Sequence, residues 1–70
     1  MTTYVYSWQD PQRLVSSVRV CMSGGHATLT VWNRGGNCGD LMVRQEDATL
    51  MTARLMGIGI ESLPTPDVYP

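Results

Sequence analysis

The sequence predicts an α+β domain in which a three- or four-stranded antiparallel β-meander carries one α-helix packed on one face. Two alternating apolar runs, at residues 27–31 and 41–43, flank a glycine-rich turn at residues 33–39, which is typical of a β-hairpin. Residues 45–57 then combine an acidic start, apolar positions at helical spacing and a final glycine. That pattern indicates one amphipathic helix.

The first strand is expected at residues 4–8, which are rich in strand-forming residues. Alternation places Tyr4, Tyr6 and Trp8 on one face of this strand. After a turn that contains proline, residues 14–22 have the pattern of a second and longer strand.

Residues 11–17 also fit a short helix, because Asp10 could cap it and Pro11 would occupy its first position. The sequence leaves strand and helix open for this segment.

Another hairpin is predicted at Gly24-Gly25, before the glycine-rich one, since two glycines supply the positive φ angles of a two-residue turn. This register makes every pair on one face apolar, and a slip by one residue would scramble both faces. The expected pairs are Met22 with Ala27, Val20 with Leu29, and Val18 with Val31. Leu41 and Val43 of the next strand are expected to join the same apolar face.

The predicted helix begins at the acidic segment 45–47, where Gln45 or Asp47 could supply a side-chain cap. Gly57 is expected to end it in the left-handed conformation. Residues 58–61 are a candidate for a short edge strand. The stripe expected to face the sheet comprises Ala48, Met51, Thr52, Leu55 and Met56.

The expected organisation is a single α+β domain over residues 1–62 and an extended proline-rich tail over residues 63–70. With 70 residues, a hydrophobic core alone gives marginal stability. Since 43% of the residues are hydrophobic and only 16% are charged, the composition favours a homo-oligomer or a constitutive protein partner over a solitary monomer.

Charge and hydropathy argue against two classes of partner. The net charge is −1 and the five basic residues, all arginine, form no run, so nucleic-acid binding is not expected. No apolar run approaches ~18 residues, so no membrane span is expected. The N-terminus lacks the pattern of a signal peptide, and two cysteines do not make a disulfide scaffold. The expected location is the cytoplasm.

The sequence offers no convincing catalytic or metal-binding set. Cys21, Cys38 and His26 are the residue types that bind zinc, but the predicted register separates the two cysteines along the sheet, whereas zinc needs converging ligands. His26 has no neighbouring acid to orient it as a general base. We therefore expect no enzyme activity, no metal and no cofactor.

A second candidate site is the glycine-rich loop. Its backbone N–H groups could hold an anion or a nucleotide at a subunit interface, with Arg34 beside Gly35 and Gly36. The spacing matches no phosphate-binding fingerprint, and the favoured explanation is that the glycines supply positive φ in a bulged turn.

The aromatic residues are the main functional prediction. Alternation places Trp32 and Arg19 together on the sheet face that the helix leaves uncovered. With Tyr4, Tyr6 and Trp8 they would form a partner-binding aromatic–arginine surface, because these residue types dominate interface hot spots. The competing prediction is that the N-terminal strand folds over Trp32 and buries it in a second small core.

Residues 28–43 (TLTVWNRGGNCGDLMV), followed by Glu46-Asp47-Ala48 and a leucine-rich helix, resemble small uncharacterised bacteriophage proteins of high-GC, actinobacterial hosts. The resemblance covers residues 26–56. It implies a phage accessory protein in the host cytoplasm that binds and modulates a host protein or a defence system. That class has no shared site residues to transfer. The expected function is thus a non-catalytic protein-binding module that self-associates.

Overall fold

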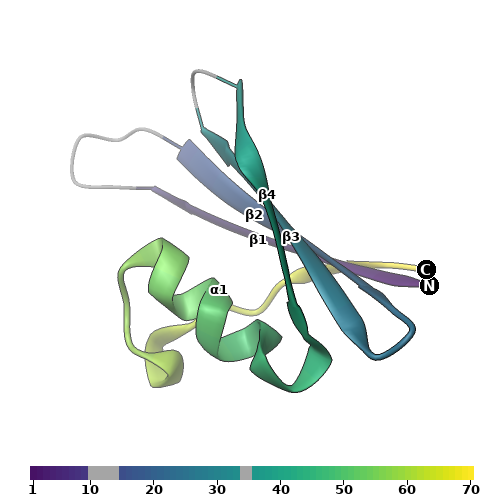
Figure 1. The fold of residues 1–70 in the computed structure, drawn as a ribbon. Helices are drawn as coiled ribbons and strands as arrows, with labels where there is room; N and C mark the ends of the chain where they lie inside the picture. Colours follow the sequence, from purple (N-terminus) through teal and green to yellow (C-terminus); the bar gives the residue numbers. More distant parts are fainter. Residues whose placement is uncertain (10–14, 34–35) are drawn as a thin grey trace.

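The computed structural model describes residues 1–9, 15–33 and 36–70. In this part of the chain, one antiparallel sheet with strand order β4-β3-β2-β1-β5 carries the helix α1 on one face (Figure 1). The α+β prediction is confirmed, but the sheet has five strands instead of three or four. The strands are β1 (Thr2–Gln9), β2 (Val15–Ser23), β3 (His26–Asn33), β4 (Gly36–Arg44) and β5 (Asp67–Tyr69). The helices are η1 (Gln45–Asp47), α1 (Ala48–Met56) and η2 (Ile60–Ser62).

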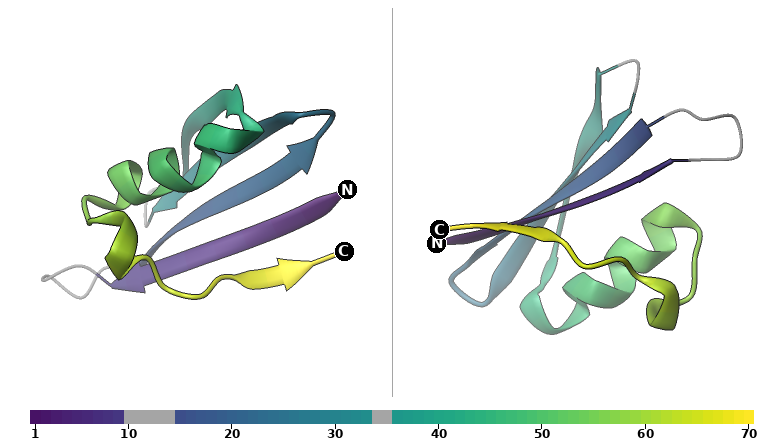
Figure 2. Two further views of the ribbon diagram at one scale, coloured as in Figure 1. Left: turned by 90° about the horizontal axis from the view of Figure 1, so that it is seen from below. Right: turned by 180° about the vertical axis from the view of Figure 1, so that it is seen from behind.

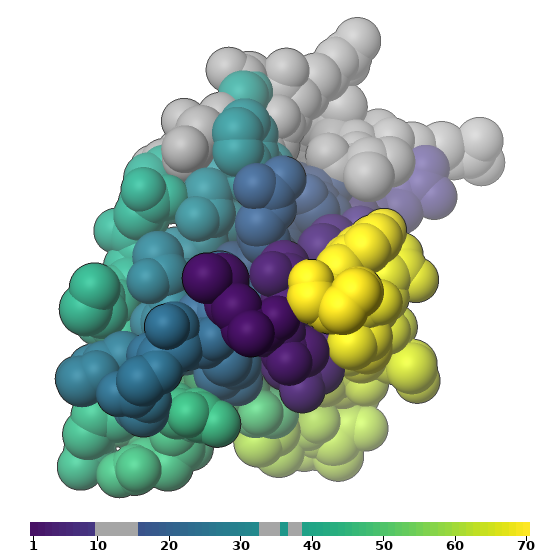
Figure 3. All heavy atoms as spheres, turned by 90° about the vertical axis from the view of Figure 1, so that its right-hand side faces the viewer, coloured from purple at the N-terminus to yellow at the C-terminus, as the bar shows by residue number. Residues whose placement is uncertain are grey.

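The additional strand comes from the proline-rich tail. β5 pairs with β1 in antiparallel register, with Tyr69 opposite Thr3 and Asp67 opposite Val5. The two ends of the chain therefore lie side by side (Figure 3). Residues 58–61, the candidate edge strand, instead lead into the short helix η2. Gly59 enters η2 in an extended conformation, and η2 turns the chain back toward β1 (Figure 2).

The β2–β3 hairpin has the predicted register. Gly24 and Gly25 have φ angles of 61° and 82°, which a two-residue hairpin turn of the favoured hand requires. The three expected apolar pairs are all present: Met22↔Ala27, Val20↔Leu29 and Val18↔Val31. Because residues 10–14 lie outside the described part, the choice between strand and helix is settled only from Val15 onward, where β2 begins.

The glycine-rich segment is strand over more of its length than predicted. β4 begins at Gly36, and the β3–β4 register shifts between Val31 and Trp32, so that β4 carries one extra residue there. Gly39, with a φ of 129°, sits beside this irregularity, where a side chain would strain the backbone. The irregularity therefore lies within the paired part of β3 and β4, whereas the sequence predicted a bulged turn.

The core lies between α1 and the strands β2 and β3 (Figure 2). Its fully buried members on the sheet are Val18, Val20, Ala27 and Leu29. Ala48, Thr52, Ala53 and Met56 are buried from the helix. The Thr52 hydroxyl donates to the Ala48 carbonyl at 2.7 Å, so this buried polar group is satisfied.

Two core predictions are wrong. Leu55 is 38% exposed, and Ala53 takes its place in the buried stripe. Leu41 faces the helix side, opposite Leu29, yet it is 40% exposed. Both errors have one cause: α1 lies over β2 and β3, which leaves the edge strand β4 and the flank of the helix outside the core.

The helix ends differ in how well they were predicted. Neither Gln45 nor Asp47 makes a side-chain cap. The Asp47 carboxylate instead accepts a hydrogen bond from Arg44 Nε at 2.9 Å. The backbone N–H of Gln45 donates to the Gly25 carbonyl, also at 2.9 Å, which anchors the start of η1 to the hairpin. At the other end Gly57 is left-handed, with a φ of 72°, as predicted.

Replacing Gly57 by alanine should lower the free energy of unfolding by about 1 kcal/mol, because the left-handed conformation is costly for a residue with a Cβ. A Cβ at Gly57 would meet no atom within 4 Å, so the cost is confined to the backbone. Gly57→Asn is the matched control and should cost less, since asparagine tolerates this conformation. Urea unfolding measures both, and equal stability of all three proteins would contradict the explanation.

Candidate binding face

In the part of the chain that the structure describes, one face of the sheet carries no helix, and we call it the open face (Figure 1). Strand alternation and the observed registers assign its residues. From β1 to β5 they include Thr3, Val5, Ser17, Arg19, Cys21, Thr28, Thr30, Trp32, Asp40, Met42, Asp67 and Tyr69. Most of them are short, which makes this a flat surface from which a few large side chains project.

Arg19 and Trp32 form the centre of the open face. The Arg19 Cζ atom lies 5.5 Å from the centroid of the Trp32 ring, within the range of a cation–π contact. The predicted pairing of these two residues is therefore confirmed. The Trp32 side chain is half-buried. Its indole Nε1 is buried without a hydrogen-bond partner in the described part of the chain, and a buried N–H group without a partner costs free energy.

One row of residues that crosses all five strands on the open face has a basic residue at its centre and an acidic residue at each end. The registers align Asp40, Thr30, Arg19, Val5 and Asp67, one from each strand. With strands about 4.8 Å apart, each aspartate lies about 10 Å from Arg19. The ion pairs within the described residues belong to Arg44, with Glu46 and Asp47. The row thus presents one cation between two anions, all three exposed to solvent.

The side chain of Tyr69 extends this surface. It stands with Thr3, Val5 and Arg19 around a shallow depression of about 470 Å³. Tyr69 is 52% exposed, and it reaches the open face only because β5 pairs with β1. Tyr69, Asp67, Asp40 and Met42 were absent from the predicted surface. The alternation of Asp67 and Tyr69 in the tail was the available signal.

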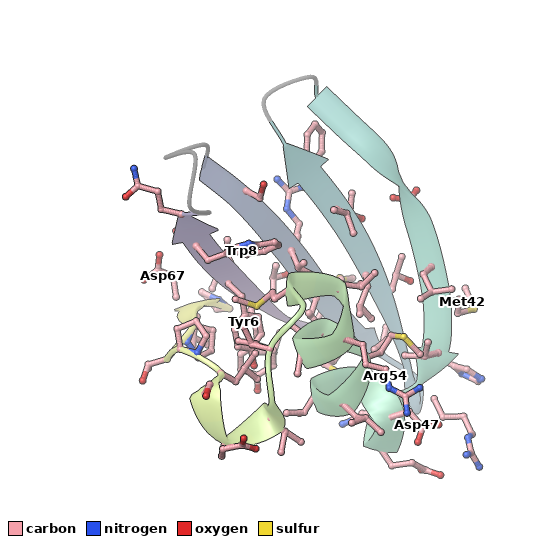
Figure 4. All side chains as sticks on the ribbon, turned by 90° about the vertical axis from the view of Figure 1, so that its left-hand side faces the viewer. Tyr6, Trp8, Met42, Asp47, Arg54 and Asp67 are labelled. Atoms are coloured by element: carbon pink, nitrogen blue, oxygen red, sulfur yellow. The ribbon has the colours of Figure 1, made fainter. Side chains whose placement is uncertain are left out.

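The other three predicted residues lie on the opposite face of the sheet. Tyr4 and Tyr6 pair with Val20 and Val18, and with Trp8 they pack against the core on the helix side (Figure 4). The five predicted residues therefore do not form one surface. Nor does β1 fold over Trp32, because it lies beside β2 in the same sheet.

Between α1 and β1, the helix face has a pocket of about 250 Å³. Tyr4 and Tyr6 line it together with Thr49 and Thr52 from the helix. Burial raises the pKa of the Tyr6 phenol above its usual value, and the neighbouring Tyr4 adds to the rise. The described residues that line the pocket are uncharged at neutral pH.

The metal-ligand candidates are dispersed. The Cys21 thiol lies 2.9 Å from the Met1 sulfur, and the His26 Nδ1 atom lies 3.3 Å from the Gly24 carbonyl oxygen. In the described residues, no group of three His, Cys, Asp or Glu side chains is placed to hold a metal. The Cys38 side chain lies outside that description.

The second predicted site cannot be placed. Arg34 and Gly35 lie outside the described residues, and Gly36 is the first residue of β4. Anion binding by this loop stays a prediction.

Comparisons with models of known protein families, with curated proteins and with solved structures found no match to this chain. No helix in the described residues has the length and hydropathy needed to cross a membrane.

Proposed function

We propose that this protein is a non-catalytic binding module whose open face docks a protein partner around Arg19 and Trp32. The observation that carries the proposal is the stacked Arg19–Trp32 pair on an uncovered sheet face. Arginine and tryptophan are the residue types most enriched at interface hot spots. A preformed stack also holds the arginine side chain in place before binding, which reduces the entropy lost on association.

The charges of Asp40, Arg19 and Asp67 indicate what kind of partner surface would fit the open face. A complementary surface places an acidic group over Arg19 and basic groups over Asp40 and Asp67, with apolar area against Val5 and Tyr69. The resemblance to phage accessory proteins makes a host protein in the cytoplasm the proposed partner, with modulation of that protein or of a defence system as the consequence.

Photo-cross-linking tests this proposal. A photoreactive amino acid at Thr30, in the centre of the open face, should yield a discrete adduct in an actinobacterial host lysate. The matched control carries it at Leu50, which is exposed on α1. Arg19→Glu should abolish the Thr30 adduct, because it reverses the central charge of the row while Trp32 stays in place.

Two outcomes would contradict the proposal. One is that Thr30 and Leu50 give the same adducts, which indicates nonspecific contact. The other is that Arg19→Glu, shown to be folded by circular dichroism, leaves the Thr30 adduct unchanged.

A further inference from the structure

The two edges of the sheet are protected unequally. β5 has three residues and is flanked by Pro66 and Pro70, which cannot donate to a neighbouring strand. β4 has nine residues, no proline and no lysine, and nothing in the described chain lies beyond it (Figure 4). A long edge of this kind is a template for pairing with another strand.

The ladder decides which backbone groups of β4 are unpaired. Ser23 and His26 flank the two-residue turn and therefore form a hydrogen-bonded pair. Alternation from His26 then directs the N–H and C=O groups of Leu41 and Val43 toward β3. The corresponding groups of Asp40, Met42 and Arg44 point away from the sheet.

We propose that a second copy of this chain pairs with this edge, β4 against β4, in antiparallel register around a two-fold axis at Met42. Met42 then lies opposite Met42 of the second copy, and Asp40 lies opposite Arg44. All three of these residues direct their free backbone groups toward the other copy, so the register satisfies every outward N–H and C=O between Asp40 and Arg44.

The side chains select this register among the symmetric ones. A two-fold axis at Asp40 would place two aspartates opposite each other, and an axis at Arg44 would place two arginines opposite each other, both of which are repulsive. An axis at Leu41 or at Val43 would place Met42 opposite Asp40 or Arg44, which leaves these charges without an opposite charge across the seam. An axis at Met42 instead gives two Asp40–Arg44 pairs on the open face. On the helix face it gives two pairs of Leu41 with Val43.

Arg44 is already held by its own chain, with Nη1 3.3 Å from Glu46 and Nε 2.9 Å from Asp47. These contacts position the guanidinium at the end of β4. Because Arg44 shares its charge among several carboxylates, the pair with Asp40 of the second copy contributes more to register than to affinity.

The exposed apolar side chains support the same interface. Leu41 and Met42 on β4 are 40% and 69% exposed, and Leu55 on α1 is 38% exposed. A two-fold axis perpendicular to the sheet keeps both helices on one face, so Leu41 becomes covered beside the new seam.

This interface leaves Arg19, Trp32 and Tyr69 uncovered in both copies, and it places Arg44 of the second copy beside Asp40 at the rim of the open face. The edge pairing does not depend on a partner bound around Arg19, and the two proposals are tested by different readouts, so either can fail while the other holds.

Sedimentation equilibrium tests the pairing by mass. The wild-type chain should sediment at twice its 7.7 kDa, and Asp40→Arg should sediment as a monomer, because arginines then face each other. Arg44→Asp should do the same. An equimolar mixture of the two variants should regain the dimer, since both opposing pairs are again of unlike charge. A monomeric wild type, or Asp40→Arg that stays dimeric, would overturn the proposal.

Disulfide trapping tests the register and covers the case in which Arg44→Asp does not fold. In a Cys21→Ser, Cys38→Ser background, Met42→Cys should form a linked dimer under mild oxidation, because directly opposed strand residues lie about 5.5 Å apart. Thr28→Cys is the matched control, one strand inside the edge on the same face, and should stay unlinked. Linkage through Thr28→Cys but not Met42→Cys would place the dimer on the open face and refute edge pairing.

Discussion

Leu29→Ala should lower the free energy of unfolding by about 2–5 kcal/mol, which for a chain of 70 residues is enough to unfold much of it at 25 °C. Leu29 is fully buried in β3, with Val20 and Leu41 on the neighbouring strands. Truncation removes buried methyl groups and leaves a cavity that the flanking strands cannot close, because their spacing is set by the ladder. Urea unfolding, followed by circular dichroism at one protein concentration, measures the loss.

Leu50→Ala is the matched control, since this leucine is 44% exposed on α1. The same truncation there should change stability by no more than about 0.5 kcal/mol. Equal losses at the two positions would mean that α1 packs on the sheet with a different face.

Ala27→Leu should lower the free energy of unfolding by about 1–3 kcal/mol through overpacking. Ala27 is fully buried on β3 and belongs to the same core cluster as Ala48 of the helix. Three additional carbons at this position have no space unless the helix moves away from the sheet. The same unfolding measurement reports the change.

Thr28→Leu places an identical side chain at the next residue, on the open face. It should change stability by less than about 1 kcal/mol, because nothing in the described chain covers that face. If Thr28→Leu were instead the more damaging of the two, the β3 register would be shifted by one residue.

The hairpin could be predicted because its determinants are local. Gly24 and Gly25 supply the positive φ angles that the turn needs, and apolar residues alternate from Val18 to Val31 in one consistent register. The left-handed end of α1 was equally predictable, since Gly57 alone provides it. In each case a few neighbouring residues decide the backbone conformation.

Predictions that depended on the placement of α1 were less accurate. Hydrophobicity favoured Leu55 for the core, but the helix axis lies so that Ala53 meets the sheet. Leu41 points to the helix side as predicted, and is exposed because α1 packs mainly over β2 and β3. Periodicity defines the face of an element, but it does not define how far the neighbouring element extends.

The predictions for the candidate site likewise succeeded where they depended on local alternation and failed where they depended on long-range contacts. Alternation within β2 and β3 correctly joined Arg19 to Trp32, since directly paired strands share faces. It could not relate β1 to them without the register across β1 and β2, and that register places Tyr4, Tyr6 and Trp8 on the helix side. The contributions of Asp67 and Tyr69 required a contact between the two ends of the chain.

The Gly24-Gly25 turn, the alternation along β2 and β3 and the end of the helix were therefore determined by the sequence alone, because backbone preference and side-chain period act over a few residues. The position of α1 and the addition of β5 were decided only in the tertiary structure. Both depend on contacts between segments distant in the sequence, whose free energy comes from burial and from strand pairing across the sheet. The open face depends on both kinds of determinant. The Arg19–Trp32 pair at its centre follows from the local β2–β3 hairpin, whereas β5 at its rim comes from the far end of the chain.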